Sequence, residues 1–196
     1  MLIIQKDNLV KRMLLPAILL AATLLNATTN EEIKREAKYA IAKLQTTLQT
    51  QLKANLKKGG PLQAANFCAR KAQAITHEIN VSFAKETTVH RTSLNYRNSE
   101  NSPKSDEREV LEAMQKDFDA GKALPNLIVK KIYDDTYKVY QPIYINKGVC
   151  LKCHGDISTL DKNAYSVIKE NYPNDKATGY KMGDLRGAFV VKIVER

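Results

Sequence analysis

An apolar residue recurs every three or four positions between residues 33 and 56. The spacing predicts one long amphipathic helix that begins at the capping box Thr29-Asn30-Glu31-Glu32 and ends at Gly59-Gly60-Pro61. Such an apolar stripe serves either as a packing face or as a dimer seam, so a homodimer through this helix is one expectation. The stripe consists of Ile33, Ala37, Ile41, Leu44, Leu48, Leu52 and Leu56.

The pattern downstream predicts shorter elements separated by polar turns. A polar loop at 95–104 follows a strand rich in β-branched residues, and Asp134-Asp135 forms the turn of a hairpin. Helices that precede strands joined by hairpins indicate an α+β domain with an antiparallel sheet and long N-terminal helices packed on it. The further helices are expected at 62–79, 105–121 and 161–171, and the strands at 85–94, 127–133, 136–145 and 188–194.

The N-terminus has the pattern of an export signal. Lys11 and Arg12 precede the uncharged run Met13–Leu25, which is thirteen residues long and short for a membrane span. With Ala27 at the cleavage position, the prediction is a signal peptide over 1–27, an amphipathic helix over 28–60 and one domain over 61–196. The alternative is an uncleaved anchor, because Leu25 is larger than the usual residue there. The expected location is the periplasm, without an integral membrane span in the mature chain.

The chain is basic, with 31 Lys and Arg against 21 Asp and Glu, for a net charge of +10. Removal of residues 1–27 takes three cations and one anion, which leaves +8. In an exported protein this charge favours acidic protein partners or anionic lipid head groups, and nucleic acid is not an expected partner. The charge could equally serve only to keep a small domain soluble.

The segment Cys150-Leu151-Lys152-Cys153-His154 carries the chemistry of the chain. The spacing C-x-x-C-H is the attachment signal for a c-type haem, in which two thiols form thioethers and the adjacent imidazole binds the iron. A zinc site would need a second ligand pair, which the downstream sequence does not supply. The two cysteines could also form a redox dithiol or a plain disulfide, although Gly155 and Asp156 predict a loop directly after the motif. One covalent haem c is therefore the expected cofactor.

A third cysteine, Cys68, lies on the second predicted helix on the same face as Ala65 and Ala72. It is either a buried inert thiol or the iron ligand opposite His154, since a thiolate is an established haem ligand. The competing ligands are Met114, Met182, His77 and His90. The 100° step per residue turns His77 to the outer face of the helix, whereas the other three stay open.

Several motifs in a fixed order resemble one known family. They are Asn66-Phe67-Cys68, Arg91-Thr92-Ser93-Leu94, Arg97-Asn98, Asn101-Ser102-Pro103, the haem motif, Tyr172-Pro173, 177–180 and 183–189. The family is the single-haem c-type cytochrome domain with a PAS-like fold, which is found alone or fused to sensor histidine kinases. The resemblance implies that His154 and Cys68 bind the iron. Ser99 and Asp106 depart from the family pattern.

Arg91, Arg97 and Arg186 lie in these motifs and suit the propionates of a haem, because a guanidinium forks onto a carboxylate. Each could instead pair with an acidic residue of the fold itself. Tyr180 could hydrogen-bond the same carboxylates or only line the pocket.

Protein ligands on both faces of the iron leave no open position for a substrate, so an enzyme is not expected. The predicted function is electron transfer with a redox partner protein, and the basic charge favours an acidic partner. The alternative is a redox or gas (NO/CO) sensor in which Cys68 leaves the iron. A peroxidase is the weakest option, because no distal acid–base group is identifiable. The sequence contains no phosphate-binding loop, zinc-protease helix or serine elbow.

Overall fold

The computed structural model describes residues 7–83 and 86–195, and for residues 7–29 only the backbone. The chain divides into two compact units, 1–36 and 37–196. Helix α1 (Asp7–Val81) supplies all the described residues of the first unit. The predicted helix start at Thr29 is wrong: α1 already begins at Asp7, since no glycine or proline interrupts residues 17–58. Residues 1–6 of the expected signal peptide lie outside the described residues.

Within the described ranges, no helix is both long enough and apolar enough to cross a membrane.

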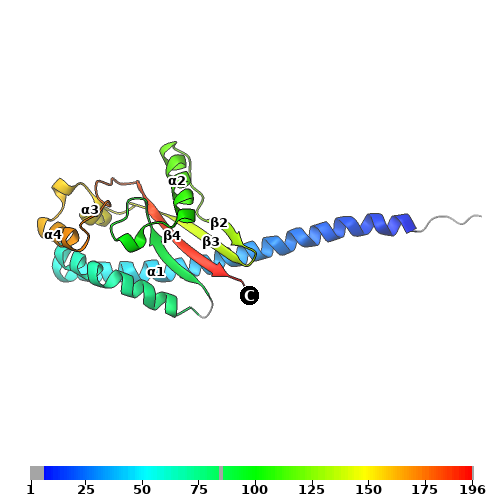
Figure 1. The fold of residues 1–196 in the computed structure, drawn as a ribbon, viewed down its shortest axis with the longest axis horizontal. Helices are drawn as coiled ribbons and strands as arrows, with labels where there is room; N and C mark the ends of the chain where they lie inside the picture. Colours follow the sequence, from blue (N-terminus) through cyan, green and yellow to red (C-terminus); the bar gives the residue numbers. More distant parts are fainter. Residues whose placement is uncertain (1–6, 84–85, 196) are drawn as a thin grey trace, which may run out of the picture. The chain divides into compact units, whose positions relative to one another are not determined.

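In the second unit α1 forms a helical hairpin, because two glycines interrupt it where the sequence predicts a stop (Figure 1). Gly60 has φ +65°, a left-handed conformation that favours glycine. The two arms run antiparallel, as two hydrogen bonds between them show. Asn55 Oδ1 accepts from Gln63 Nε2 at 3.1 Å near the bend, and Lys43 Nζ donates to Ser82 Oγ at 2.7 Å near the far end.

The strands form one four-stranded antiparallel sheet in the order β1-β4-β3-β2. The hairpin predicted around Asp134 and the long last strand are both present. The α+β class and the antiparallel sheet are therefore confirmed. The strands are β1 (Thr88–Thr92), β2 (Ile128–Tyr133), β3 (Thr136–Tyr144) and β4 (Leu185–Val194).

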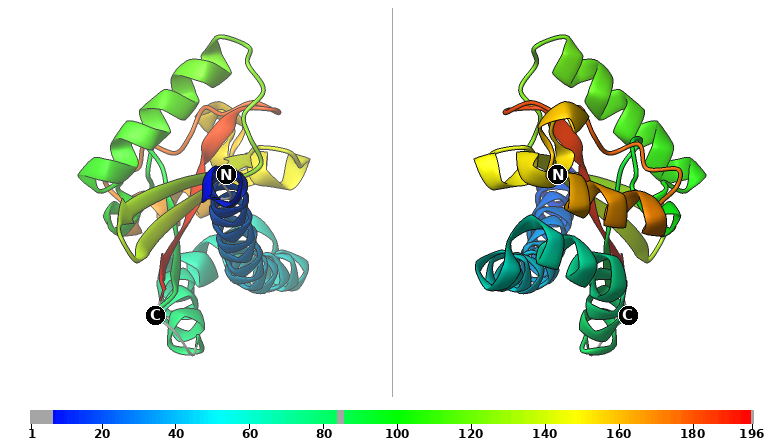
Figure 2. Two further views of the ribbon diagram at one scale, coloured as in Figure 1. Left: turned by 90° about the vertical axis from the view of Figure 1, so that its right-hand side faces the viewer. Right: turned by 90° about the vertical axis from the view of Figure 1, so that its left-hand side faces the viewer.

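Helix α2 (Ser105–Asp119) packs on one face of this sheet through a core of Leu111, Met114, Leu185 and Ala188. Its first residue is Ser105, as the sequence predicts, and its N-cap is Lys104. The hairpin of α1 lies on the other side of the sheet (Figure 2). The alternating strand residues therefore bury apolar side chains on both faces.

Short segments between β3 and β4 complete the unit. Helix α3 (Gly148–His154) contains the C-x-x-C-H motif, and helix α4 (Lys162–Asn171) follows with Asp161 as its N-cap. Two 3-10 turns, Ser99–Asn101 and Ile157–Thr159, lie in the connecting loops. A small core of Ala65, Ala164 and Ile168, with Cys153, Val167 and Tyr172 packed against it, joins the second arm of α1 to α4 and to the end of α3.

Candidate functional site

Helix α3 places the two motif cysteines one turn apart and His154 at its last position. The helix has only seven residues and ends at Gly155, whose N–H donates to the carbonyl oxygen of Leu151 at 2.9 Å. A Cβ atom at Gly155 would lie 2.6 Å from that same oxygen, so a side chain there would push the helix end away. Cys68, Cys150 and Cys153 are free and half-buried.

The imidazole of His154 is oriented by a backbone group. Its Nδ1 lies 2.7 Å from the carbonyl oxygen of Ala177 and donates to it, which leaves Nε2 as the free acceptor. Burial lowers the pKa of His154 well below its usual value, and the positive charges of Arg186 and Arg97 lower it further. The ring is therefore neutral with Nε2 as its acceptor nitrogen, which is the form that binds a metal.

The fold brings Cys68 to the same site from the second arm of α1. Burial raises the pKa of its thiol, while the positive charges of Arg91 and Arg97 oppose this and the nearby Cys153 adds to it. The interaction with Cys153 shows that two residues 85 positions apart in the sequence lie near each other in the fold. The inward direction predicted for Cys68 from the helix period agrees with its half-buried position.

The other candidate ligands lie elsewhere. Met114 is buried in the core between α2 and the sheet, and Met182 is 53% exposed. His77 is exposed on α1, as predicted. His90 faces α2, where its Nε2 lies 3.4 Å from Glu107 Oε2.

Arg97 holds the site together through partners of the fold itself. Its Nε donates to Asp175 Oδ2 at 3.1 Å, and one terminal nitrogen donates to the carbonyl oxygens of Cys153 at 2.6 Å and Ala177 at 3.2 Å. Asp175 is only 1% exposed, so this ion pair is well shielded from water. Arg97 thus joins the end of α3 to the loop that orients His154. Of the two expected partners, a haem propionate or an acidic residue of the fold, the structure shows the acidic residue.

Arg91 and Arg186 differ from Arg97, because no acidic side chain pairs with either of them among the described residues. One terminal nitrogen of Arg186 donates to Ser93 Oγ at 2.6 Å and to the carbonyl oxygen of Asn95 at 3.0 Å, while its buried Nε has no partner. Burial lowers the pKa of both guanidinium groups. Two buried cations without anions leave positive charge that a bound anionic group would compensate.

Tyr180 connects these residues to the histidine. The guanidinium of Arg186 lies 5.3 Å from the centre of the Tyr180 ring, and that ring meets His154 edge-on at a centroid distance of 6.3 Å. The ring of Tyr180 therefore contacts both Arg186 and His154.

Sequence reasoning missed the groups that orient the site. Asp175, which pairs with Arg97, is one acidic residue among 21, and nothing in its neighbourhood marks it. The carbonyl oxygen of Ala177 that accepts from His154 is a backbone atom, which no residue type encodes. The motif at 177–180 is the one feature of the sequence that points to this loop.

The fold and the site together define an α+β domain in which the short helix α3 carries two free thiols and an imidazole close to several arginines. The sequence model of the Tll0287-like family matches residues 26–194, so this chain belongs to that family. The family resemblance inferred from the sequence motifs is thereby confirmed. No curated protein matches the chain.

One solved structure has the same fold, the cyanobacterial haem protein Tll0287. It superposes with a TM-score of 0.61 at 22% sequence identity, and the match covers 84% of this chain and 96% of that one. The similarity in fold therefore extends over nearly the whole of the compared protein.

Proposed function

We propose that this protein is a single-haem c-type cytochrome that transfers electrons outside the cytoplasm. The observation that carries the proposal is the arrangement on α3: two free thiols one turn apart, followed by a histidine whose Nδ1 is bonded to a backbone carbonyl and whose Nε2 is left available. Thioethers to Cys150 and Cys153 would attach the haem, and its bound iron would supply a one-electron couple. Membership of a family with a haem protein among its relatives supports this assignment.

In this proposal His154 and Cys68 would hold the iron of the haem. The hydrogen bond from Nδ1 to the carbonyl oxygen of Ala177 leaves Nε2 as the ring nitrogen available to a metal. Cys68 lies on α1, where burial raises the pKa of its thiol and the positive charge of Arg91 opposes that rise. A bound metal ion would itself favour the thiolate. With both positions filled by side chains, the site supports electron transfer and not chemistry on a substrate.

Arg91 and Arg186 are the residues that suit the haem propionates. Both are buried beside the motif and lack an acidic partner among the described side chains. The buried Nε of Arg186 has no hydrogen-bond acceptor in the fold, and a propionate oxygen would supply one. Arg97 suits this role less well, because Asp175 and two backbone carbonyls already accept hydrogen bonds from its Nε and one terminal nitrogen.

The proposed location is the periplasm, because haem is attached to C-x-x-C-H motifs outside the cytoplasm. The basic pair and the uncharged run at the start of the chain support export.

The test uses the protein matured in a host that attaches haem c. We expect a pigment that acidified organic solvent does not extract and a low-spin ferric spectrum by electron paramagnetic resonance. The Cys68→Ala variant should lose the thiolate signature, whereas the matched control Met182→Ala should keep the spectrum of the parent. A colourless product contradicts the whole proposal, and an unchanged Cys68→Ala spectrum contradicts only the sixth ligand.

A second candidate function is a redox or gas sensor. The observation that favours it is the origin of Cys68 on α1, 85 positions before Cys153, so that this ligand does not belong to the segment that would attach the haem. A ligand from a separate element could leave the iron on reduction. Carbon monoxide added to the reduced protein distinguishes the two functions: a rapid and complete spectral shift supports the sensor, and no shift supports electron transfer.

A further inference from the structure

The positive charge of the chain is concentrated on one element. Residues 37–77 contain seven lysines and arginines and not one aspartate or glutamate, against a net charge of +10 for the whole chain. In the structure these residues form the two arms and the bend of the α1 hairpin. The seven cations are Lys38, Lys43, Lys53, Lys57, Lys58, Arg70 and Lys71.

Five of these cations lie on the half of the hairpin nearest the bend, and all five are exposed. No ion pair involves any of them among the described residues. Lys53 and Lys57 are four positions apart, so they share one face of the first arm. We call this surface the hairpin patch, and it consists of Lys53, Lys57, Lys58, Arg70 and Lys71.

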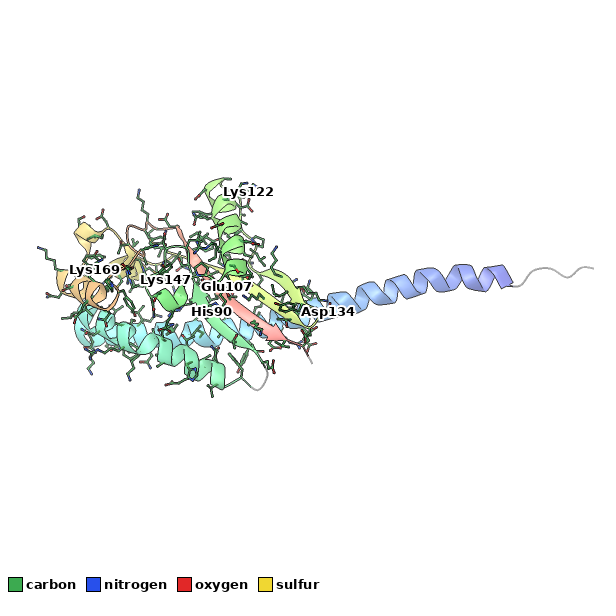
Figure 3. The ribbon with its side chains drawn as sticks, viewed as in Figure 1. His90, Glu107, Lys122, Asp134, Lys147 and Lys169 are labelled. Atoms are coloured by element: carbon green, nitrogen blue, oxygen red, sulfur yellow. The ribbon has the colours of Figure 1, made fainter. Side chains whose placement is uncertain are left out.

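The hairpin patch lies next to the haem-attachment segment. Ala65, between the bend and Cys68, packs into the small core that includes Ala164 and Ile168 of α4, with Cys153 against it. Figures 1 and 2 show the bend of α1 beside α4 and α3. In Figure 3, Lys169 of α4 lies at this end of the unit, whereas Asp134 lies in the β2–β3 turn at the other end.

We propose that the hairpin patch is the docking surface for an acidic redox partner protein, which it would hold within reach of the haem. This inference rests on the proposed function. Unpaired cations close to the site of electron exchange raise the encounter rate with an anionic surface and orient it. Because electron transfer needs only a brief contact, a patch of exposed charges suits it better than a large apolar interface.

The composition of the patch favours a protein partner over a membrane. A helix that binds a bilayer presents large apolar side chains beside its lysines. Near the bend the largest exposed apolar side chain is Leu62, which is only 38% exposed. The outer face of the first arm otherwise carries Thr46, Thr50 and Ala54.

The test compares two charge-reversal variants of the full chain that each lower the net charge by four. One is Lys53→Glu with Lys57→Glu in the patch, and the control is Lys116→Glu with Lys130→Glu, two exposed lysines without ion pairs on α2 and β2. Binding of a poly-L-glutamate peptide is measured by calorimetry at low ionic strength. We expect a loss of about tenfold or more in the patch variant and less than about threefold in the control.

A second measurement links docking to the haem. On an electrode coated with a carboxylate-terminated monolayer, the patch variant should exchange electrons at least about fivefold more slowly than the control. Equal losses in both variants overturn the inference, because they would show that only net charge matters. The inference is also overturned, in favour of a membrane, if the patch variant no longer binds phosphatidylglycerol vesicles but still binds poly-L-glutamate as the parent does. An unchanged haem spectrum in both variants separates these outcomes from a failure of the proposed function.

Discussion

Glu107 is the buried charge through which α2 is fixed to the sheet, and its removal gives the sharpest stability prediction. Its side chain is 1% exposed and lies 2.9 Å from Lys138 Nζ and 3.4 Å from His90 Nε2, while the N–H of Lys104 donates to it at 3.2 Å. Figure 3 shows His90 and Glu107 close together near the start of α2. Burial by itself would raise the pKa of Glu107, but the hydrogen bonds from His90 and Lys138 outweigh it.

The result is a pKa lowered from 4.5 to about 2. A carboxyl group whose pKa is lower in the folded state stabilises the fold at any pH above its unfolded-state pKa. This stabilisation is lost as the pH falls through the folded-state pKa. The lowered pKa contributes about 3 kcal/mol to the free energy of unfolding at neutral pH, and about half of that contribution remains at pH ~3. The Glu107→Gln variant keeps the shape but has no charge to titrate, so it lacks this contribution.

We therefore expect Glu107→Gln to unfold about 3 kcal/mol more easily than the parent at neutral pH and about 1.5 kcal/mol more easily at pH ~3. Urea titrations followed by circular dichroism at both pH values measure the two differences. The control is Glu109→Gln, an exposed position on the same helix, which should change stability by less than about 0.5 kcal/mol. If the gap between Glu107→Gln and the parent is the same at both pH values, the pairing argument is refuted.

Three further predictions concern the sheet and the site. Gly187 has φ +153°, and a Cβ atom there would collide with the carbonyl oxygen of Thr92, so Gly187→Ala should lose about 3 kcal/mol or more in urea titrations. Arg97→Gln leaves the buried carboxylate of Asp175 without its cation, and we expect a loss of about 3–5 kcal/mol that Arg97→Lys restores only in part. Arg91→Leu removes a buried positive charge, so the midpoint potential of the haem should fall by about 60 mV for each 1.4 kcal/mol of lost charge interaction. A redox titration measures this potential, and a rise would contradict the assignment.

The sequence by itself determined the local structure and the chemistry. The turn residues Asp134-Asp135 predict the hairpin around them, and two glycines mark the bend of α1, because these patterns depend on neighbours in the chain. The C-x-x-C-H motif specifies its chemistry, since the spacing of Cys150, Cys153 and His154 is itself the signal. A local capping motif mispredicts a helix start where the residues on both sides of it are helical. The capping box at Thr29 does not start a helix, because α1 runs continuously from Asp7.

Only the tertiary structure decided how distant residues act on the motif. Three arginines look equivalent in the sequence, but Arg97 has a buried acid and two carbonyls as partners, whereas Arg91 and Arg186 have no acid among the described side chains. The fold also placed Cys68 near Cys153 and buried Met114 in the core between α2 and the sheet. These relations depend on which segments pack together, and that packing follows from the burial of apolar surface across the whole unit, which no short stretch of sequence contains.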